Sequence, residues 1–313
     1  MTPAQLTVII PTYNRANVLD RCLHSLFSQS VSSELFDIIV ADDGSPDHTR
    51  AVVAHWSGRR GPVVHYSFAP NAGANAARNR AVRLAKGAIL LFINDDSLGS
   101  PQLVHEHLTM HQQLSDHHAA VLGRVTVDPQ LPPNRLAALH LDRAFQAIGD
   151  RCQLDWRWFF TCNVSVHKSL LEQAGRFEER MRYHEDLELA ERLSHFGLRL
   201  FYNPRALAYH HHLLTEHEFL EVARREARAL AEWARKAPHL HSTLAEFGFE
   251  PALPARRRWK NRLRSALVNH ATRPLWTAVA RHCPPALESL ALKLYLQIYQ
   301  TEMRACLLRE LKS

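Results

Sequence analysis

Apolar runs alternate with helical stripes along the first hundred residues. Four runs of mostly apolar residues, each bounded by polar turns, predict buried strands at 6–10, 36–41, 63–68 and 89–93. Between them, apolar residues recur every three or four positions, which predicts helices near 16–27, 51–56 and 74–86. Near-continuous apolar strands separated by helices are typical of a parallel sheet covered on both faces. We therefore expect an α/β fold.

The second half is less regular. A strand is predicted at 159–166, a short helix at 168–174 and a longer helix at 185–196 that ends before Gly197. Two short apolar runs at 198–202 and 206–209 read as strands. A helical pattern then covers about 216–235, and a further helical region follows residue 250.

Polar motifs follow three of the predicted strands. PTYN follows the first strand, DDGS the second, and NDDS the fourth. Ligands of such sheets bind outside the carboxyl ends of the strands, so the three motifs are expected to form one site. Two adjacent carboxylates, Asp95 and Asp96, cost electrostatic energy unless a cation or hydrogen-bond donors lie beside them.

Composition indicates a globular protein. The chain has 313 residues, of which 46% are hydrophobic and 22% charged. No charged, apolar leader precedes the first strand, and no long apolar window predicts a membrane-spanning helix. The five cysteines include no C-x-x-C pair, which favours reduced thiols in a cytosol and gives no zinc signal.

The positive charge is concentrated at the C-terminal end. Residues 251–313 hold 12 Lys and Arg against 3 Asp and Glu, so the other 250 residues hold 26 against 28. Such a basic extension suggests an anionic membrane surface or nucleic acid as a partner. RRRWKNRLR resembles an amphipathic surface, which favours membrane contact through 256–281; the alternative is a solvated helical subdomain. Nucleic acid is not expected, because no recognised motif accompanies the charge.

Neither of two common phosphate-binding loops is present. The first strand is followed by no P-loop and no G-x-G-x-x-G, which argues against an ATPase of that class and a dinucleotide-dependent oxidoreductase. The turn carries Tyr13 instead, and Asp43 follows the second strand. An aromatic ring that stacks and a carboxylate that accepts N–H bonds suit a nucleobase, although Asp43-Gly44 is also a common turn.

Five separated motifs resemble the family-2 glycosyltransferases, which have the GT-A fold. They are TVIIPTYNR, DIIVADDGSPD, NAGANAARNRAVRLAKGAILLFINDD, FFTCNVSV and YHEDLELAERL, and the resemblance covers about residues 5–213. It implies a GT-A catalytic domain over 1–250, with a nucleotide-binding half at 1–125 and an acceptor-binding half at 126–250. A basic helical extension would occupy 251–313. The implied reaction transfers a sugar, with inversion, from a nucleotide donor, usually UDP-linked, to an acceptor hydroxyl.

The resemblance also assigns roles to residues of the nucleotide site. Tyr13 would lie near the base, Arg78 near the ribose and phosphates, and Asp95 at the ribose. The full set of nucleotide-binding positions is Pro11, Thr12, Tyr13, Asn14, Asp43, Arg78 and Asp95.

A divalent cation, Mn or Mg, is the implied cofactor. Asp96 would hold it against the charge that collects on the leaving diphosphate. Asn94 is a further expected ligand through its amide oxygen, but it stands where many members carry Asp, so the site has one charge fewer. His210 is a further expected ligand and its nitrogen suits Mn, although a histidine triplet at 210–212 is also typical of an exposed surface.

The general base is expected in the HED motif. The resemblance places Asp186 as the base that takes the hydroxyl proton, with Glu185 orienting the acceptor or the base. Acidic residues are also common in the first turn of a helix, where they complement its dipole. The acceptor, a glycan or lipid-linked glycan, would meet residues 126–160, where Trp156 and Trp158 could stack on a sugar.

Two other functions stay open at the level of sequence. Asn94 leaves room for a non-catalytic nucleotide-sugar-binding subunit of a polysaccharide assembly complex. A nucleotidyltransferase of similar fold would need a Gly-rich, basic loop after the first strand, and PTYNRANV lacks it. The expected location is the cytoplasm, peripheral on the inner face of the membrane.

Overall fold

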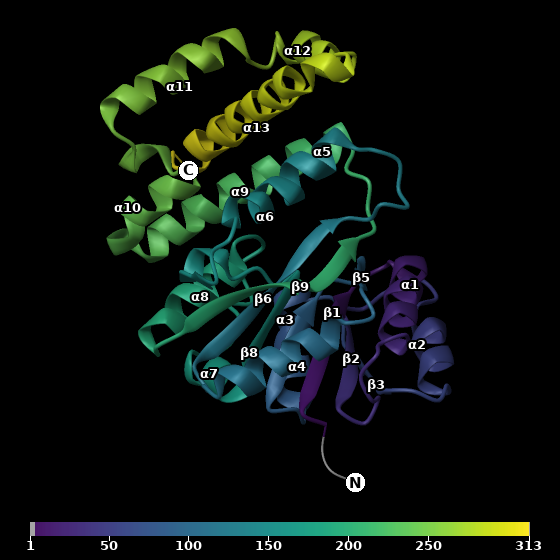
Figure 1. Cartoon of the computed structure of the whole chain (residues 1–313). Coiled ribbons are helices and arrows are strands. Elements are labelled where there is room, and N and C mark those ends of the chain that lie inside the picture. The colour runs from purple at the N-terminus through teal and green to yellow at the C-terminus, as the bar shows by residue number, and fades with distance from the viewer. Residues whose placement is uncertain (1–3, 313) are drawn as a thin grey trace. The chain divides into compact units, whose positions relative to one another are not determined.

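A computed structural model describes residues 4–312 (Figure 1). The chain forms two compact units, one of residues 4–132 and 141–212 and the other of 133–140 and 213–312. Helix α9 (Glu216–Lys236) belongs to the second unit, where it packs along α13 (Glu288–Glu310). The division therefore falls at residue 212, whereas the sequence analysis ended the catalytic domain at 250. The extent of the catalytic domain stays a prediction.

The first unit is built on a nine-stranded mixed sheet in the order β3-β2-β1-β4-β8-β6-β9-β5, with β7 paired to β9. The strands are β1 (Leu6–Thr12), β2 (Phe36–Asp42), β3 (Val63–Phe68), β4 (Ile89–Ile93), β5 (Ser97–Gly99), β6 (Ala119–Val127), β7 (Gln153–Leu154), β8 (Asn163–His167) and β9 (Arg199–His210). The first four strands pair in parallel, and β8 is antiparallel to β4 and β6. The expected α/β fold is confirmed.

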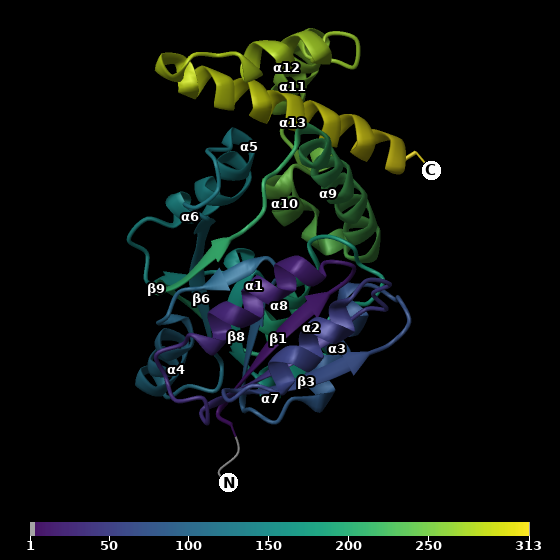
Figure 2. The same cartoon turned by 90° about the vertical axis from the view of Figure 1, so that its right-hand side faces the viewer.

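Helices cover the parallel half of the sheet. Those of this unit are α1 (Ala16–Phe27), α2 (Thr49–Ser57), α3 (Ala74–Leu84), α4 (Leu103–Leu114), α6 (Arg143–Ile148), α7 (Lys168–Gln173) and α8 (Glu185–His195). Helices α1 and α2 contact each other (Figure 2), and α3 packs on β1 and β2. Because parallel crossovers are right-handed, the return from β3 to β4 places α3 on the face opposite α1 and α2. Strand order therefore reverses between β1 and β4, where such sheets open a ligand-binding crevice.

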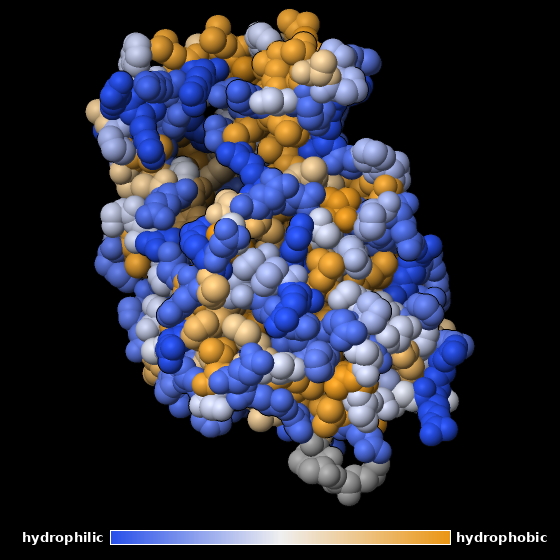
Figure 3. Space-filling view, viewed as in Figure 1, coloured by the Kyte–Doolittle hydropathy of each residue, from blue (hydrophilic) through white to orange (hydrophobic). Residues whose placement is uncertain are grey.

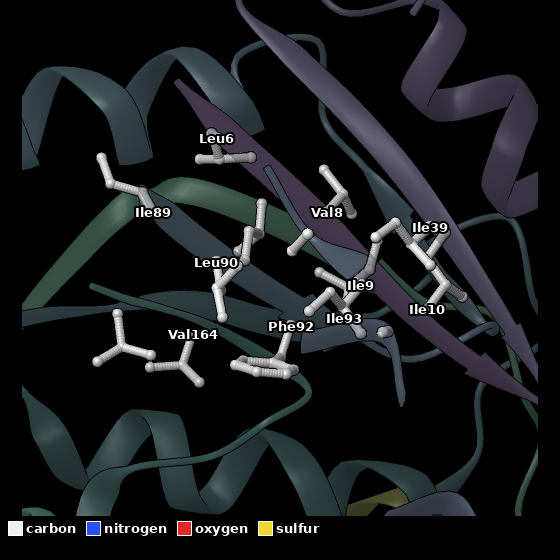
Figure 4. Packing of buried hydrophobic residues seen from close by; sticks show 14 of the residues in the cluster. Leu6, Val8, Ile9, Ile10, Ile39, Ile89, Leu90, Phe92, Ile93 and Val164 are labelled. Carbon is white, nitrogen blue, oxygen red and sulfur yellow. The ribbon is translucent and has the colours of Figure 1, made fainter. Parts of the chain in front are cut away.

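The core explains why the strands read as continuous apolar runs. Every residue of β1, β2 and β4 is buried, so side chains on both faces of these strands are packed. Figure 4 shows Leu90 and Phe92 of β4 beside Ile9 of β1 and Val164 of β8. Burial of such side chains from both faces stabilises each strand by about 1.5–3 kcal/mol per large residue.

Two strand predictions need correction. The strand predicted at 159–166 begins only at Asn163, because the backbone N–H of Thr161 donates to a side chain of α8 and joins no ladder. The runs predicted at 198–202 and 206–209 belong to one strand, β9, with a register shift opposite Gly123 and Arg124. Pro204 lies in that irregular stretch, where its missing N–H costs no ladder bond.

The second unit is helical. Besides α9 and α13 it contains α5 (Arg135–Ala137), α10 (His241–Leu244), α11 (Ala255–Leu267) and α12 (Arg273–Arg281). Buried Glu302 of α13 accepts from Arg224 of α9 (2.7 Å) and from Arg273 of α12 (2.8 Å), which ties three helices together. Among residues 4–312, none of the helices combines the length and the apolarity needed to cross a bilayer.

Candidate active site

The end of β1 meets the turn after β4. Thr12 Oγ1 donates to Asp95 Oδ2 at 2.8 Å, across a sequence separation of 83 residues. Pro11 and Thr12 are buried, whereas Tyr13 is 46% exposed. Asn14 has a left-handed backbone (φ 55°), and its N–H donates to Ser45 Oγ at 2.9 Å, in the loop after β2. The three polar motifs therefore converge, with a ring available for stacking at their edge.

Arg15 joins both carboxylates after β4. Its Nη1 donates to Asp95 Oδ1 at 2.9 Å, and its Nη2 donates to Asp96 Oδ2 at 2.8 Å. Burial raises the pKa of Asp95 to about 6, although Arg15 opposes the rise. For Asp96, burial is outweighed by the His210 and Arg15 side chains, so its pKa is lowered. A cation beside the two aspartates is thus already supplied by the chain.

Strand β9 brings His210 to Asp96. Ser97 of β5 pairs with His210, and the His211 N–H donates to the Asp96 carbonyl at 2.8 Å. His210 Nε2 lies 3.5 Å from Asp96 Oδ2. His211 faces another acid, because its Nδ1 lies 2.6 Å from Asp128 Oδ2. The histidine triplet is therefore part of a strand end, where two of its members contact buried aspartates.

The expected metal ligands give a mixed result. Within residues 4–312, Asp96 Oδ1 and His210 Nδ1 are buried without a hydrogen-bond partner, and a carboxylate with an imidazole suits Mn²⁺. The Asn94 side chain makes no hydrogen bond to the described part of the chain. The same residues contain no group of three His, Cys, Asp or Glu arranged to hold a metal ion. A cation bound by Asp96 and His210 would need oxygens from a ligand to complete its shell.

The Asp43 carboxylate is hydrogen-bonded to backbone N–H groups. Its two carboxylate oxygens accept from the N–H groups of Ala72 (2.9 Å) and Gly73 (2.7 Å). Gly73 has φ 101°, a conformation that favours glycine. Asp43 thus holds the loop before α3, and a base N–H would have to use a remaining lone pair. Its contact with the base stays a prediction.

Arg78 lies against the HED motif. Its Nη1 donates to Glu185 Oε1 and to Asn75 Oδ1, both at 2.9 Å, and the guanidinium is buried. No bond joins Arg78 to Asp95 or Asp96 in the described structure, so its expected place beside the ribose and phosphates stays a prediction. The pair instead holds Glu185 at the start of α8.

Asp186 is partly buried at the start of α8. Its Oδ2 accepts from the Thr161 N–H at 3.2 Å, and its Oδ1 accepts from the Leu187 N–H at 2.9 Å. Burial, with the adjacent Glu185 carboxylate, raises the pKa of Asp186 to about 6. A carboxylate in this range takes up a proton near neutral pH, as a general base must.

Cys162 lies just before β8, in the segment between Asp186 and the turn that carries Asp96. Burial raises the pKa of its thiol to about 12, and the charges of Asp186 and Asp96 both add to the rise. Ile93 at the end of β4 pairs with Asn163, so the acidic turn begins opposite the segment whose Thr161 N–H donates to Asp186. Sequence reasoning missed the contacts of Arg15, Thr161 and Asp128; of these, only Arg15 had a signal, as the charged end of PTYNR.

Curated proteins with similar sequences include two named as glucosyltransferases. A validoxylamine A glucosyltransferase from Streptomyces hygroscopicus subsp. jinggangensis is 32% identical over 221 residues, which cover 62% of this chain and 52% of the relative. A poly(ribitol-phosphate) beta-glucosyltransferase from Bacillus spizizenii is 32% identical over 114 residues, covering 36% of this chain and 18% of the relative. The chain thus spans about half the length of the first of these curated relatives.

Solved structures share the fold. The mannosyltransferase PcManGT from Pyrobaculum calidifontis, in complex with GDP-Man and Mn²⁺, superposes with a TM-score of 0.65 at 19% identity, covering 98% of this chain and 88% of that one. S. aureus TarS 1–349 in complex with UDP-GlcNAc superposes with a TM-score of 0.57 at 16% identity, covering 96% of this chain and 90% of that one. The sequence model of Glycosyl transferase family 2 matches residues 7–174, more than half of the chain. The chain therefore belongs to glycosyl transferase family 2 and has the GT-A fold.

Proposed function

We propose that this chain is an inverting glycosyltransferase that moves a sugar from a UDP-sugar to a hydroxyl of a glycan or lipid-linked glycan. The observation that carries the proposal is the partly buried carboxylate of Asp186, which has a pKa raised to about 6 and accepts from Thr161, just before the strand that pairs with β4. One acid on the acceptor side and an acidic turn on the donor side are what inverting transfer needs.

The donor would bind at the switch point between β1 and β4. Tyr13 offers an exposed ring to the base, and Asp95, held by Thr12 and Arg15, offers oxygens to the ribose. Relatives named as glucosyltransferases and a structural neighbour with UDP-GlcNAc favour a hexosyl or N-acetylhexosaminyl group. The neighbour with GDP-Man makes GDP-mannose the donor to test against.

The acceptor would bind beside α8. The 3-10 turn Trp156–Trp158 contacts α8, so two partly exposed indoles lie near the helix that begins at Glu185. Aromatic rings of this kind stack on the apolar face of a sugar. Glu185, held by Arg78, would orient the acceptor hydroxyl or the base.

Proton transfer then falls to Asp186. Its carboxylate takes the proton of the acceptor hydroxyl while the oxygen bonds to the anomeric carbon from the face opposite the diphosphate. The bond from that carbon to the diphosphate oxygen breaks, and the nucleoside diphosphate leaves with the electron pair. Asp96 and His210 would hold a divalent cation, which when bound stabilises charge on the diphosphate. Asp186 is regenerated by losing its proton to water.

Asn94 favours a second candidate, a non-catalytic subunit that binds nucleotide-sugars, because the amide removes one charge from the acidic turn. The two are separated by testing UDP-glucose, UDP-GlcNAc and GDP-mannose by thermal shift with and without Mn²⁺. The stabilising donor is then assayed for transfer to saccharide acceptors and for release of nucleoside diphosphate. Release or transfer supports the enzyme; stabilisation without turnover on any acceptor supports the binding subunit.

The proposed location is the cytoplasm, on the inner face of the membrane. All five cysteines are free thiols, and three of them are buried, which suits a reducing compartment. The proposed second partner is an anionic membrane surface met through residues 256–281.

A further inference from the structure

Helix α11 places its apolar side chains in solvent. Trp259, Leu263 and Leu267 are 60%, 48% and 67% exposed, and their spacing of four residues puts them on one stripe of the helix. The partly buried positions are polar: Asn261 and Ser265. Ser265 Oγ accepts from Arg304 of α13 at 2.9 Å. The helix thus turns a polar face inward and its apolar face outward, the reverse of an ordinary surface helix.

Exposed apolar residues also occur on α12 and on the segment that follows it. Leu275 and Val279 of α12 are 63% and 41% exposed, again four residues apart, and Leu287 and Leu290 follow. Residues 259–290 therefore hold seven of the 14 large apolar side chains that are exposed in the described structure. Figure 3 shows orange apolar atoms gathered over the α11 and α12 region beside blue hydrophilic ones. Such a gathering of exposed apolar residues marks an interaction surface.

The charge around this surface has one sign. Helix α11 carries six cations and no acid, and within residues 4–312 none of these side chains makes an ion pair: Arg256, Arg257, Arg258, Lys260, Arg262 and Arg264. Cations left unpaired next to an apolar stripe match a surface that is apolar inside and anionic outside. That combination describes the interface of an anionic phospholipid bilayer.

A cavity beside α11 fits an anionic headgroup. It measures about 430 Å³ between α11 and α13, and Arg257, Lys260 and Arg264 line its α11 side. Gln297 and Gln300 add amide groups from α13. Arg304 and Glu250 also line it and pair with each other. Glu246 lines it as well, so the three cations of α11 share the cavity with one further acid.

The geometry points to a docking site for an anionic phospholipid membrane on the second unit. Trp259, Leu263 and Leu267 enter the membrane interface. Arg257, Lys260 and Arg264 bind lipid phosphates, and one of these phosphates occupies the cavity that the three cations line. The inference rests on the proposed membrane partner but not on sugar transfer. Nucleic acid fits less well, because a phosphate backbone makes no use of exposed leucines.

The test uses the full chain and vesicles, without substrate. Binding is measured by co-sedimentation with phosphatidylcholine vesicles that contain or lack ~30% phosphatidylglycerol. We expect binding only to the anionic vesicles, and weaker binding at about 500 mM salt. Leu263→Ser with Leu267→Ser should weaken it by at least about tenfold. Arg257→Gln, Lys260→Gln and Arg264→Gln together should weaken it on the order of 100-fold, at about fivefold per charge.

Matched controls come from the first unit. Leu84→Ser removes an exposed leucine (56%), and Arg60→Gln removes an exposed cation; both should bind vesicles like the parent chain. Thermal melts establish that all variants fold. No sedimentation with anionic vesicles, equal loss in the controls, or displacement of vesicles by a single-stranded RNA would overturn the inference. Donor turnover, assayed without vesicles, reports separately on the catalytic proposal.

Discussion

The raised pKa of Asp186 has a measurable consequence for the pH dependence of transfer. With a pKa of about 6, about 91% of the carboxylate is ionised at pH 7 but only about 9% at pH 5. Turnover at saturating donor should therefore fall about tenfold between these pH values. A carboxyl at the ordinary value of 3.8 would stay about 94% ionised at pH 5, and turnover would hardly change.

Saturating donor matters because Asp95 titrates in the same range. Its pKa is also raised to about 6, so protonation of the free enzyme weakens donor binding and raises KM for the donor. The assay is release of nucleoside diphosphate at pH 5, 6, 7 and 8, with circular dichroism at each pH. A kcat that is flat down to pH 5 in folded protein would refute the assignment of Asp186 as the base.

Asp186→Asn completes the test. Turnover should fall about 10²–10⁴-fold, while binding of the nucleoside diphosphate is kept. Because the folded-state pKa is raised, the carboxylate costs stability above pH 6, and this cost disappears as the pH falls below the unfolded value near 4. The variant should thus be more stable at pH 8 by about 1–3 kcal/mol, and no more stable at pH 3.5.

Glu188→Gln is the control, since it lies in the same turn of α8. Both its carboxylate oxygens accept from Arg192 at 2.8 Å, away from the proposed chemistry. Its turnover per folded molecule should match that of the parent chain. Near-normal turnover of Asp186→Asn, or an equal loss in Glu188→Gln, would place the base elsewhere.

Two further predictions concern the acidic turn. Asp96→Asn should abolish the extra thermal stabilisation that Mn²⁺ gives in the presence of UDP, because the amide removes the charge of one expected ligand; an unchanged Mn²⁺ effect would contradict this. Arg15→Met leaves Asp95 and Asp96 without the cation that bridges them, so the chain alone should melt at a lower temperature and gain more from Mn²⁺ than the parent chain does. Equal Mn²⁺ shifts in the two proteins would show that Arg15 and the metal do not compete.

The parallel half of the sheet was predictable because β1, β2 and β4 are buried on both faces, and because β3 at the sheet edge is still a short, mostly apolar run. Strands β3 and β4 begin and end where the apolar runs do, and β1 and β2 extend only one or two residues further. By contrast, no element was expected where α4 and β6 form. Helix α4 buries His107 and His111, which lie 2.8 Å from Ser165 Oγ, so polar residues hide its periodicity.

The motifs indicated which segments converge but not how they bond. The family resemblance assigned Asp95, Asp96 and Asp186 to one site. The structure joins Asp95 to Thr12 and places Asp96 beside His210, whereas the place of Asp186 in that site stays a prediction. The resemblance could not show that Arg15 spans the two aspartates, since the reach of a long side chain depends on the turn it starts from. Nor could it show that Asp43 is occupied by the N–H groups of Ala72 and Gly73, because those bonds form only when the loop before α3 folds back.

The bond between Arg78 and Glu185 joins residues 107 positions apart, and it bears on when the site can form during synthesis. Chains emerge at about 5–20 residues per second, so roughly 6–23 s separate the appearance of Asp96 from that of His210. Through that interval the nascent chain holds Asp95 and Asp96 without the β9 partner that completes their surroundings. The acidic turn can therefore take its final surroundings only after β9 has been made.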